Sequence, residues 1–142
     1  MLKAVIDASI VLKWFSEERE EAVNQARQIY QFLRDNKIAF YAPQFLLVET
    51  LNILAKKKQI SPALQKKAMR LLTTSGITFT SLSPQNTISL VAVIKKHDLT
   101  AYDALYIALA QEKKCRLLTV DVQLLTIPRS FTPTQLLEST EI

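Results

Sequence analysis

Short apolar runs alternate along this chain with longer stretches in which apolar residues recur at helical spacing. The short apolar or β-branched runs are typical of strands and the longer stretches of helices. Strands are predicted over Ala4–Asp7, Ala39–Ala42, Ile77–Thr80 and Leu117–Val120, with a weaker one near Phe131. Helices are predicted near Ile10–Phe15 and over Glu20–Arg34, Pro43–Lys57, Pro62–Thr74, Pro84–His97 and Ala101–Lys113.

This alternation favours an α/β domain with a mainly parallel sheet. The chain has a single glycine, Gly76, which argues against a turn-rich all-β fold. Pro43, Pro62 and Pro84 are each predicted in the first turn of a helix, where a missing N–H costs nothing. With 142 residues and neither an internal repeat nor a flexible linker, the sequence predicts one domain spanning residues 1–142.

The charge balance points to a polyanionic partner. The formal net charge is +5, and the basic residues come in small groups: Lys56–Lys58, Lys66–Lys67, Lys95–Lys96, and Lys113, Lys114 and Arg116. Any one group can equally be a solvated helix end, where cations complement the helix dipole. Their sum favours nucleic acid over an acidic protein.

Compartment and membrane association follow from what the sequence lacks. Cys115 is the only cysteine, so an intrachain disulfide is excluded, and the start MLKAVIDAS lacks the apolar core of a signal peptide. The most apolar neighbourhood, residues 39–55, contains Pro43, Glu49 and Asn52 and is not a membrane span of roughly 20 apolar residues. We expect a cytoplasmic protein that does not bind membranes.

Two aspartates end predicted strands. Asp7 closes the run AVID, and Asp121 closes the run LLTVD. In open parallel sheets, the carboxyl ends of the strands form the edge at which ligands bind. The alternative for each residue is that it only caps the helix that follows. Because two such ends occur in one short chain, we favour a shared site.

Glu49 lies within a predicted helix, in the segment FLLVETLNIL. Helical spacing places it on one face with the residues Phe45, Leu46, Asn52 and Ile53. An unpaired buried carboxylate is costly, so Glu49 is expected to meet a metal or a hydrogen-bond donor, or to reach solvent at the rim of a cleft. A buried ion pair with a lysine is the alternative.

Asp103 lies in the segment LTAYDALYIALA, three residues after Thr100. That spacing matches a capping box in which aspartate replaces the usual Glu or Gln, so capping alone could explain Asp103. The first turn of a helix is also a place from which a carboxylate can face the edge of the sheet, while Ala104, Ile107 and Ala108 pack on the same side.

Four carboxylates with no His or Cys set of ligand spacing suit a hard cation, Mg²⁺ or Mn²⁺, and disfavour zinc. Carboxylates that converge repel one another and raise each other's proton affinity, so a divalent ion is needed to neutralise them. Sites of this kind perform phosphoryl or phosphodiester chemistry, in which the metal activates water.

The motifs that carry these acids resemble those of the PIN-domain ribonucleases, and within them the VapC-type toxins of bacterial and archaeal toxin–antitoxin systems. The match is nearly full length and preserves order: VIDASIVLKWF, then a proline and LLVETLNIL, then LTAYDALYIALA, then LLTVD.

The resemblance implies a three-layer α/β/α domain that cleaves single-stranded or structured RNA, tRNA among the candidates, by attack of a metal-activated water. One or two Mg²⁺ or Mn²⁺ ions would be held by the catalytic residues Asp7, Glu49, Asp103 and Asp121. The hydroxyl residues that orient these ligands in the family correspond to Ser9 and Thr119. The implied partners are a cognate antitoxin protein and a second copy of the chain.

Two other functions compete with this hypothesis. In the first, the acids are structural and the chain is a non-catalytic module that binds RNA or docks an antitoxin. The second, phosphotransfer through an aspartyl nucleophile, needs another acid two residues after Asp7, where this chain has Ser9.

Several chemically capable residues have ordinary explanations. His97 falls at a predicted helix end, and Trp14 and Phe15 are expected to be core residues, with an apolar groove for an antitoxin helix as the minority interpretation. Tyr102 and Tyr106 could stack on bases, yet their spacing fits packing equally well.

Overall fold

The computed structural model describes residues 2–16, 21–57, 59–125, 127 and 130–131. Their strands form one sheet in the order β3-β2-β1-β4-β5, and every pairing is parallel. The strands are β1 (Leu2–Ile6), β2 (Ile38–Pro43), β3 (Thr78–Thr80), β4 (Arg116–Leu118) and β5 (Ser130–Phe131). The helices are α1 (Ala8–Trp14), α2 (Glu21–Arg34), α3 (Phe45–Lys56), α4 (Pro62–Thr73), α5 (Pro84–His97), α6 (Ala101–Lys113) and α7 (Val122–Leu125).

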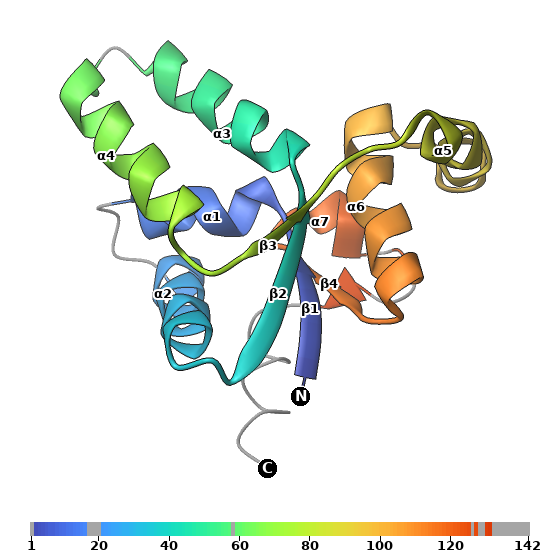
Figure 1. The fold of residues 1–142 in the computed structure, drawn as a ribbon, viewed down its shortest axis with the longest axis horizontal. Helices are drawn as coiled ribbons and strands as arrows, with labels where there is room; N and C mark the ends of the chain where they lie inside the picture. The colour runs from blue at the N-terminus through green and yellow to red at the C-terminus, as the bar shows by residue number, and fades with distance from the viewer. Residues whose placement is uncertain (1, 17–20, 58, 126, 128–129, 132–142) are drawn as a thin grey trace.

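Helices cover both faces of the sheet, which gives three layers. In Figure 1, α1 and α2 lie on one side of β1 and β2, and α6 lies on the other side with α5 beyond it. Contacts agree with this view, since α2 packs on β2 while α6 packs on β1, β2 and β4. The prediction of an α/β domain with a parallel sheet in three layers is therefore confirmed.

The central strand β1 is buried because helices cover it on both faces. Ala4, Val5 and Ile6 have no exposed surface, and Ala4 pairs with Phe40 on one side and Arg116 on the other. Such continuous apolar runs are expected of parallel strands buried on both faces. Because β1 and β4 end side by side, the residues that follow them emerge at one edge of the sheet.

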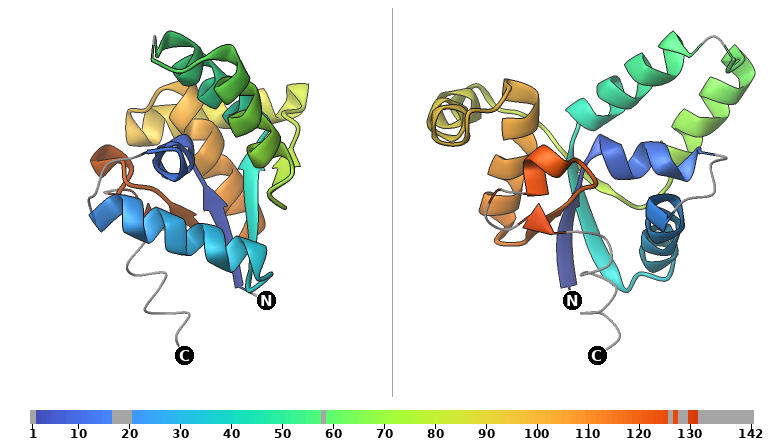
Figure 2. Two further views of the ribbon diagram at one scale, coloured as in Figure 1. Left: turned by 90° about the vertical axis from the view of Figure 1, so that its left-hand side faces the viewer. Right: turned by 180° about the vertical axis from the view of Figure 1, so that it is seen from behind.

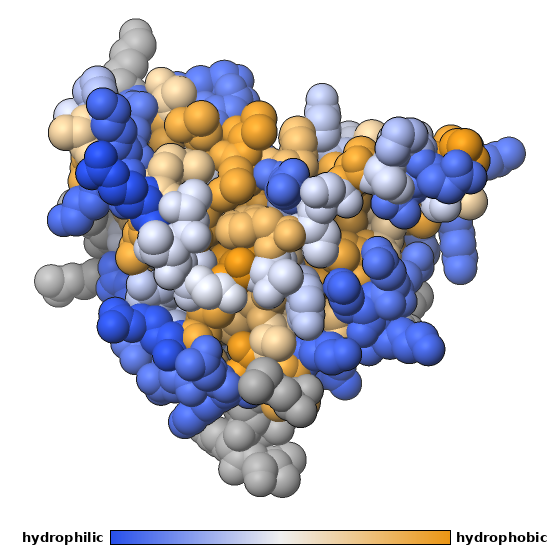
Figure 3. Space-filling model, in the orientation of Figure 1, coloured by the Kyte–Doolittle hydropathy of each residue, from blue (hydrophilic) through white to orange (hydrophobic). Residues whose placement is uncertain are grey.

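Helices α3 and α4 form an arm that projects beyond this edge, as the views in Figures 1 and 2 show from three directions. Figure 3 shows apolar surface over the region of α3. Two side chains of α3, Val48 and Leu51, are 60% and 46% exposed. None of the helices in the described part of the chain is long and apolar enough to cross a membrane.

One proline prediction is wrong. Pro62 and Pro84 do begin helices, after the capping residues Ser61 and Ser83, but Pro43 is the last residue of β2. A proline is tolerated at a strand end because its missing N–H removes no hydrogen bond that the sheet needs there. The next N–H, of Gln44, donates to the carbonyl of Thr80 at 2.9 Å, and α3 begins only at Phe45.

Candidate active site

The two aspartates that follow strands both cap helices. Oδ1 of Asp7 accepts hydrogen bonds from the backbone N–H groups of Ser9 (3.0 Å) and Ile10 (3.3 Å) at the start of α1. Oδ1 of Asp121 accepts from the N–H of Gln123 (3.0 Å) at the start of α7. Capping was the alternative to a shared site, but the two roles are compatible, because a cap fixes the carboxylate in one orientation.

All four predicted acids line one cavity of about 200 Å³ at this edge of the sheet. They come from four parts of the chain: the start of α1, the middle of α3, the first turn of α6 and the start of α7. The remaining lining residues are Ala8, Ser9, Leu12, Ile53 and Tyr106. Among the described residues, the lining holds four acids and no lysine or arginine, so none of these residues offers Glu49 the ion pair considered from the sequence.

Asp7 lies at the buried end of the cavity, with only 4% of its surface exposed. Besides the two amides, Ser9 Oγ donates to its Oδ1 and Thr119 Oγ1 donates to its Oδ2, each at 2.5 Å. Burial raises the pKa of Asp7 from 3.8 to about 6, although these hydrogen bonds act to lower it. The desolvation of the charged form therefore outweighs four donors.

The two hydroxyl residues also tie the ends of β1 and β4 together. Ser9 Oγ accepts from the N–H of Val120 (3.0 Å), and Thr119 Oγ1 accepts from the N–H of Asp121 (2.9 Å). Each hydroxyl thus donates to Asp7 and accepts from the loop that carries Asp121. This network fixes the orientation of Asp7 and the path of the backbone at Asp121.

Glu49 is held by a tyrosine. Tyr106, which is 1% exposed, donates its hydroxyl to Oε1 of Glu49 at 2.8 Å. Burial raises the pKa of Glu49, the bond from Tyr106 lowers it, and the charge of Asp103 raises it further. In turn, burial and the Glu49 charge raise the pKa of the Tyr106 hydroxyl, so this hydroxyl stays a donor.

Asp103 faces the cavity from the first turn of α6. The capping interaction is present, since Thr100 Oγ1 accepts from the N–H of Asp103 at 3.2 Å. Burial raises the pKa of the Asp103 carboxyl, and the charge of Asp121 adds to this shift. The acids therefore act on one another as like charges, as the sequence predicts for converging carboxylates.

The donor set fits a hard divalent cation in its chemistry. Oxygen ligands, carboxylates above all, are what Mg²⁺ and Mn²⁺ prefer, and the cavity is lined by four carboxylates and the Ser9 hydroxyl. The spacing is more open than in a compact chelate: among the described residues, no three His, Cys, Asp or Glu side chains lie close enough to hold a metal ion. An ion bound by two acids and completed by water suits such spacing, because Mg²⁺ usually keeps several waters.

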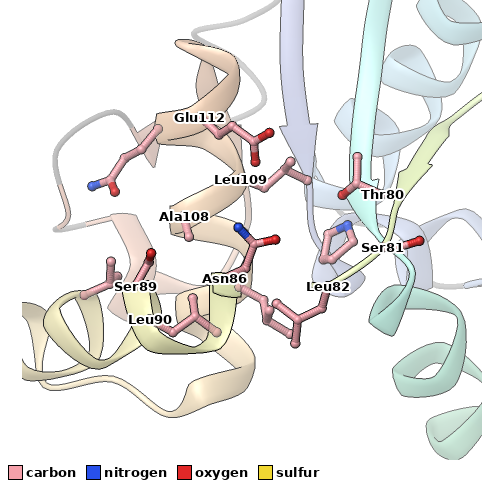
Figure 4. Close-up of a pocket in the computed structure, with 13 residues that line it drawn as sticks. Thr80, Ser81, Leu82, Asn86, Ser89, Leu90, Ala108, Leu109 and Glu112 are labelled. Carbon is pink, nitrogen blue, oxygen red and sulfur yellow. The ribbon is translucent and has the colours of Figure 1, made fainter. Parts of the chain in front are cut away.

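A larger cavity of about 450 Å³ lies elsewhere, between α5, α6 and the residues after β3. Figure 4 shows hydroxyl, amide and leucine side chains around it, with Glu112 at one side. Its described lining contains none of the predicted site residues, and Glu112 is the only carboxylate among those lining residues. The concentration of acids therefore marks the smaller cavity as the candidate active site.

Tyr106 is the residue of this site that sequence reasoning missed, since it was considered only for stacking or packing. A signal was available: Tyr106 follows Asp103 by three residues, and residues at that spacing share a helix face. Tyr102 lies one residue before Asp103 and is 57% exposed, so the two tyrosines have different environments.

Comparison with protein families identifies the fold. The family model of the PIN domain matches residues 4–129, nearly the whole chain. This chain is a member of the PIN-domain family. No curated protein sequence is significantly similar to it.

Solved structures with the same fold share little sequence with this PIN domain. PAE2754 from Pyrobaculum aerophilum has a TM-score of 0.70 at 18% identity, and the match covers 99% of this chain and 96% of that one. A toxin–antitoxin complex from Klebsiella pneumoniae gives 0.62 at 19%, covering 92% and 97%. VapC20 of Mycobacterium tuberculosis, a sarcin-ricin loop cleaving toxin, gives 0.67 at 12%, covering 84% and 90%. At these identities the likeness concerns the fold.

Proposed function

We propose that this PIN domain is a Mg²⁺- or Mn²⁺-dependent endoribonuclease that acts as a VapC-type toxin. The observation that carries the proposal is the convergence of Asp7, Glu49, Asp103 and Asp121 on one cavity at the carboxyl edge of the sheet. Membership of the PIN family supports it, as does the fold shared with a toxin–antitoxin complex and with a sarcin-ricin loop cleaving toxin.

In this proposal the four acids form the metal site, in which two of them would bind an ion and water would complete its coordination. A bound divalent ion would supply an activated water and would neutralise charge on the phosphate and the leaving oxygen. Asp7 presents a carboxylate whose orientation is fixed by Ser9 and Thr119. Because its Oδ2 has only the Thr119 hydroxyl among the hydrogen bonds described, it is the oxygen better placed to take a metal.

Hydrogen bonds also position the other three acids or the helix starts that carry them. Tyr106 occupies Oε1 of Glu49, which leaves Oε2 for the cavity. Asp103 and Asp121 enter from helix starts, where the backbone N–H groups at Thr100–Asp103 and Asp121–Gln123 are engaged in caps. These supports fix the elements from which the four carboxylates line the cavity, and burial raises the pKa of Asp7, Glu49 and Asp103 there.

The proposal extends to the partners. A cognate antitoxin protein would block the cavity, as expected for a toxin of this kind, and the chain would function as a homodimer. RNA is the substrate class favoured by the net charge of +5, since the phosphate backbone is attracted to a basic protein.

The decisive experiment compares cleavage of labelled total RNA by the wild type and by Asp7→Asn, each with Mn²⁺ and with excess chelator. We expect wild-type cleavage only with metal, and a loss of more than about 100-fold in the variant. Asp98→Asn is a matched control, because Asp98 is an exposed aspartate at the end of α5, outside the cavity.

A folded Asp7→Asn protein that cuts RNA at the wild-type rate would exclude the proposed site. RNA that is bound but left uncut by the wild type under every condition would favour the non-catalytic binding module instead.

A further inference from the structure

Two aromatic rings are stacked at the starts of α3 and α6. The centroids of Phe45 and Tyr102 are 4.9 Å apart, and their planes are inclined by only 9°. Phe45 is half-buried, whereas Tyr102 is 57% exposed. Phe45 covers one face of the Tyr102 ring, while the Tyr102 residue as a whole is more than half exposed to solvent.

The stacked pair is adjacent to two of the site acids. Tyr102 immediately precedes Asp103, so their Cα atoms lie about 3.8 Å apart. Phe45 precedes Glu49 by four residues, and residues at that spacing lie on the same face of a helix, one turn apart. The pair therefore bridges the two helices that carry Glu49 and Asp103, next to the acidic cavity but outside the residues that line it.

The acidic cavity is too small to enclose a whole nucleotide of an RNA substrate, so the base must be bound outside it. Sites that enclose a drug-sized ligand have volumes of roughly 300–1,000 Å³. The acidic cavity has about 200 Å³, enough for a metal ion and a phosphate but small for a whole nucleotide. The base attached to a phosphate in this cavity must then lie on the rim.

We propose that the Phe45–Tyr102 pair is a stacking platform for a nucleobase next to the phosphate that enters the acidic cavity. This inference rests on the proposed nuclease function and deepens it by assigning the base-binding surface. An aromatic face attracts any base, because every base has a π-face, and the interaction needs no charge. Phe45 holds the Tyr102 ring in place, which lowers the entropy lost when a base stacks on it.

The structure distinguishes Tyr102 from the other tyrosine of this helix. Tyr106 is buried and its hydroxyl is bound to Glu49, so it cannot receive a base. Among the described residues that flank the site acids, Val122 is also strongly exposed, at 75%, but it offers no π-face. It follows Asp121 as Tyr102 precedes Asp103, which makes it the matched control.

The test measures binding of a fluorescein-labelled single-stranded RNA of mixed sequence in excess chelator, by fluorescence anisotropy. We expect Tyr102→Leu to weaken binding about tenfold, and Tyr102→Phe and Tyr102→Trp to retain wild-type affinity. Val122→Ala should bind as the wild type does. A Tyr102→Leu protein that binds this RNA with wild-type affinity would overturn the proposal.

A second measurement separates stacking from a structural role of the ring. The base is removed from one nucleotide of the RNA at a time, and each abasic RNA is tested on the wild type and on Tyr102→Leu. The platform predicts one position at which the loss is large for the wild type and small for the variant. If every abasic position costs both proteins the same, the ring bridges the helices without touching a base.

These outcomes are independent of catalysis, because the binding assay contains no free metal. Should the wild type fail to cut RNA with Mn²⁺ while the abasic test identifies the stacked base, the proposed nuclease function fails and the platform stands. Should the wild type cut RNA and Tyr102→Leu cut it with unchanged KM, the nuclease function stands and the platform fails.

Discussion

At the scale of single residues, burial governs the charge of Asp7. Its pKa rises from 3.8 to about 6, so the folded state binds a proton more readily than the unfolded chain. The contribution of Asp7 to the free energy of unfolding is therefore fully present at low pH, and it is lost as the pH rises between about 4 and 6. An uncharged residue of the same shape avoids that loss.

We therefore predict that Asp7→Asn is more stable than the wild type at neutral pH without metal. Asparagine also caps helices, and its side-chain oxygen can accept from the N–H groups of Ser9 and Ile10. A shift of about two pKa units is equivalent to about 3 kcal/mol. Between about pH 4 and pH 7, the free energy of unfolding of the wild type should therefore fall by about 3 kcal/mol relative to that of Asp7→Asn. Urea unfolding in chelator at several pH values measures this; a constant difference would contradict it.

The hydroxyl of Tyr106 gives a second prediction. Tyr106→Phe removes the one hydrogen bond that orients Oε1 of Glu49, so we expect the affinity for Mn²⁺ and the rate of RNA cleavage to fall by about 10- to 100-fold. Mn²⁺ binding is measured by calorimetry, which needs no activity. Tyr41→Phe, at a half-buried tyrosine on β2, is the matched control.

If Tyr106→Phe binds Mn²⁺ as tightly as the wild type, the tyrosine supports the packing of α6 and has no part in positioning Glu49.

At the scale of elements, the sequence predicted every strand and helix except α7, with bounds that differ by a few residues. Helix α7 has four residues, Val122–Leu125, which is too short for a periodic pattern to indicate. The error at Pro43 has another cause, because a proline is compatible with both a strand end and the first turn of a helix. The pairing of Pro43 with Thr80 in the folded protein decides for the strand end.

The arrangement of the acids was predictable only in part. Strand ends place Asp7 and Asp121 at one edge by topology alone. The approach of Glu49 and Asp103 depends on how α3 and α6 pack over that edge, which no local pattern encodes. The bond between Tyr106 and Glu49 joins residues 57 positions apart in the chain, so it too appears only in the folded protein.

A metal in the cavity would join elements that are distant in sequence, since the acids that line it come from α3, α6 and the starts of α1 and α7. We predict that Mn²⁺ at roughly 100 times its Kd stabilises the fold by about 3 kcal/mol and raises the unfolding midpoint by about 5–10 °C. Calorimetric or fluorescence melting curves measure the rise.

The control is Glu112→Gln, which removes a carboxylate from the larger cavity. Mn²⁺ should raise the unfolding midpoint of Glu112→Gln as much as that of the wild type, whereas Asp7→Asn should lose most of this rise. An equal rise in all three proteins would show that Mn²⁺ binds outside the proposed site.

Helix α5 buries little of its surface against the rest of the fold. It packs on α6, and Leu90 is its only buried side chain, while Ile88 and Val91 are 66% and 64% exposed. Helices with few buried contacts open locally at low free-energy cost. We predict that the amides of α5 exchange with deuterium about tenfold faster or more than those of α6, as measured by mass spectrometry of peptides; equal protection would show that another contact holds α5.

At the scale of the whole molecule, the charges are unevenly distributed. The net charge is +5, yet the described part of the cavity wall has four acids and no basic residue. Long-range attraction therefore comes from lysines outside the cavity, and it brings RNA to the protein without placing a phosphate among the acids. Placement then depends on the metal and on uncharged contacts at the rim.

Attraction by the lysines and stacking on the uncharged Tyr102 ring should contribute separately to RNA affinity. The logarithm of the binding constant should fall linearly with the logarithm of the salt concentration, with a slope of about −0.7 for each phosphate neutralised. Replacing both Lys66 and Lys67 by glutamine removes two exposed charges of α4 and should make that slope less steep if RNA passes over this helix. Tyr102→Leu removes no charge, so it should lower affinity by the same factor at every salt concentration and leave the slope unchanged. Anisotropy titrations in chelator at four or more salt concentrations give both quantities. A Tyr102→Leu line that converges with the wild-type line at high salt would mean that the ring acts through the charged path, because an uncharged stacking contact is not screened by salt.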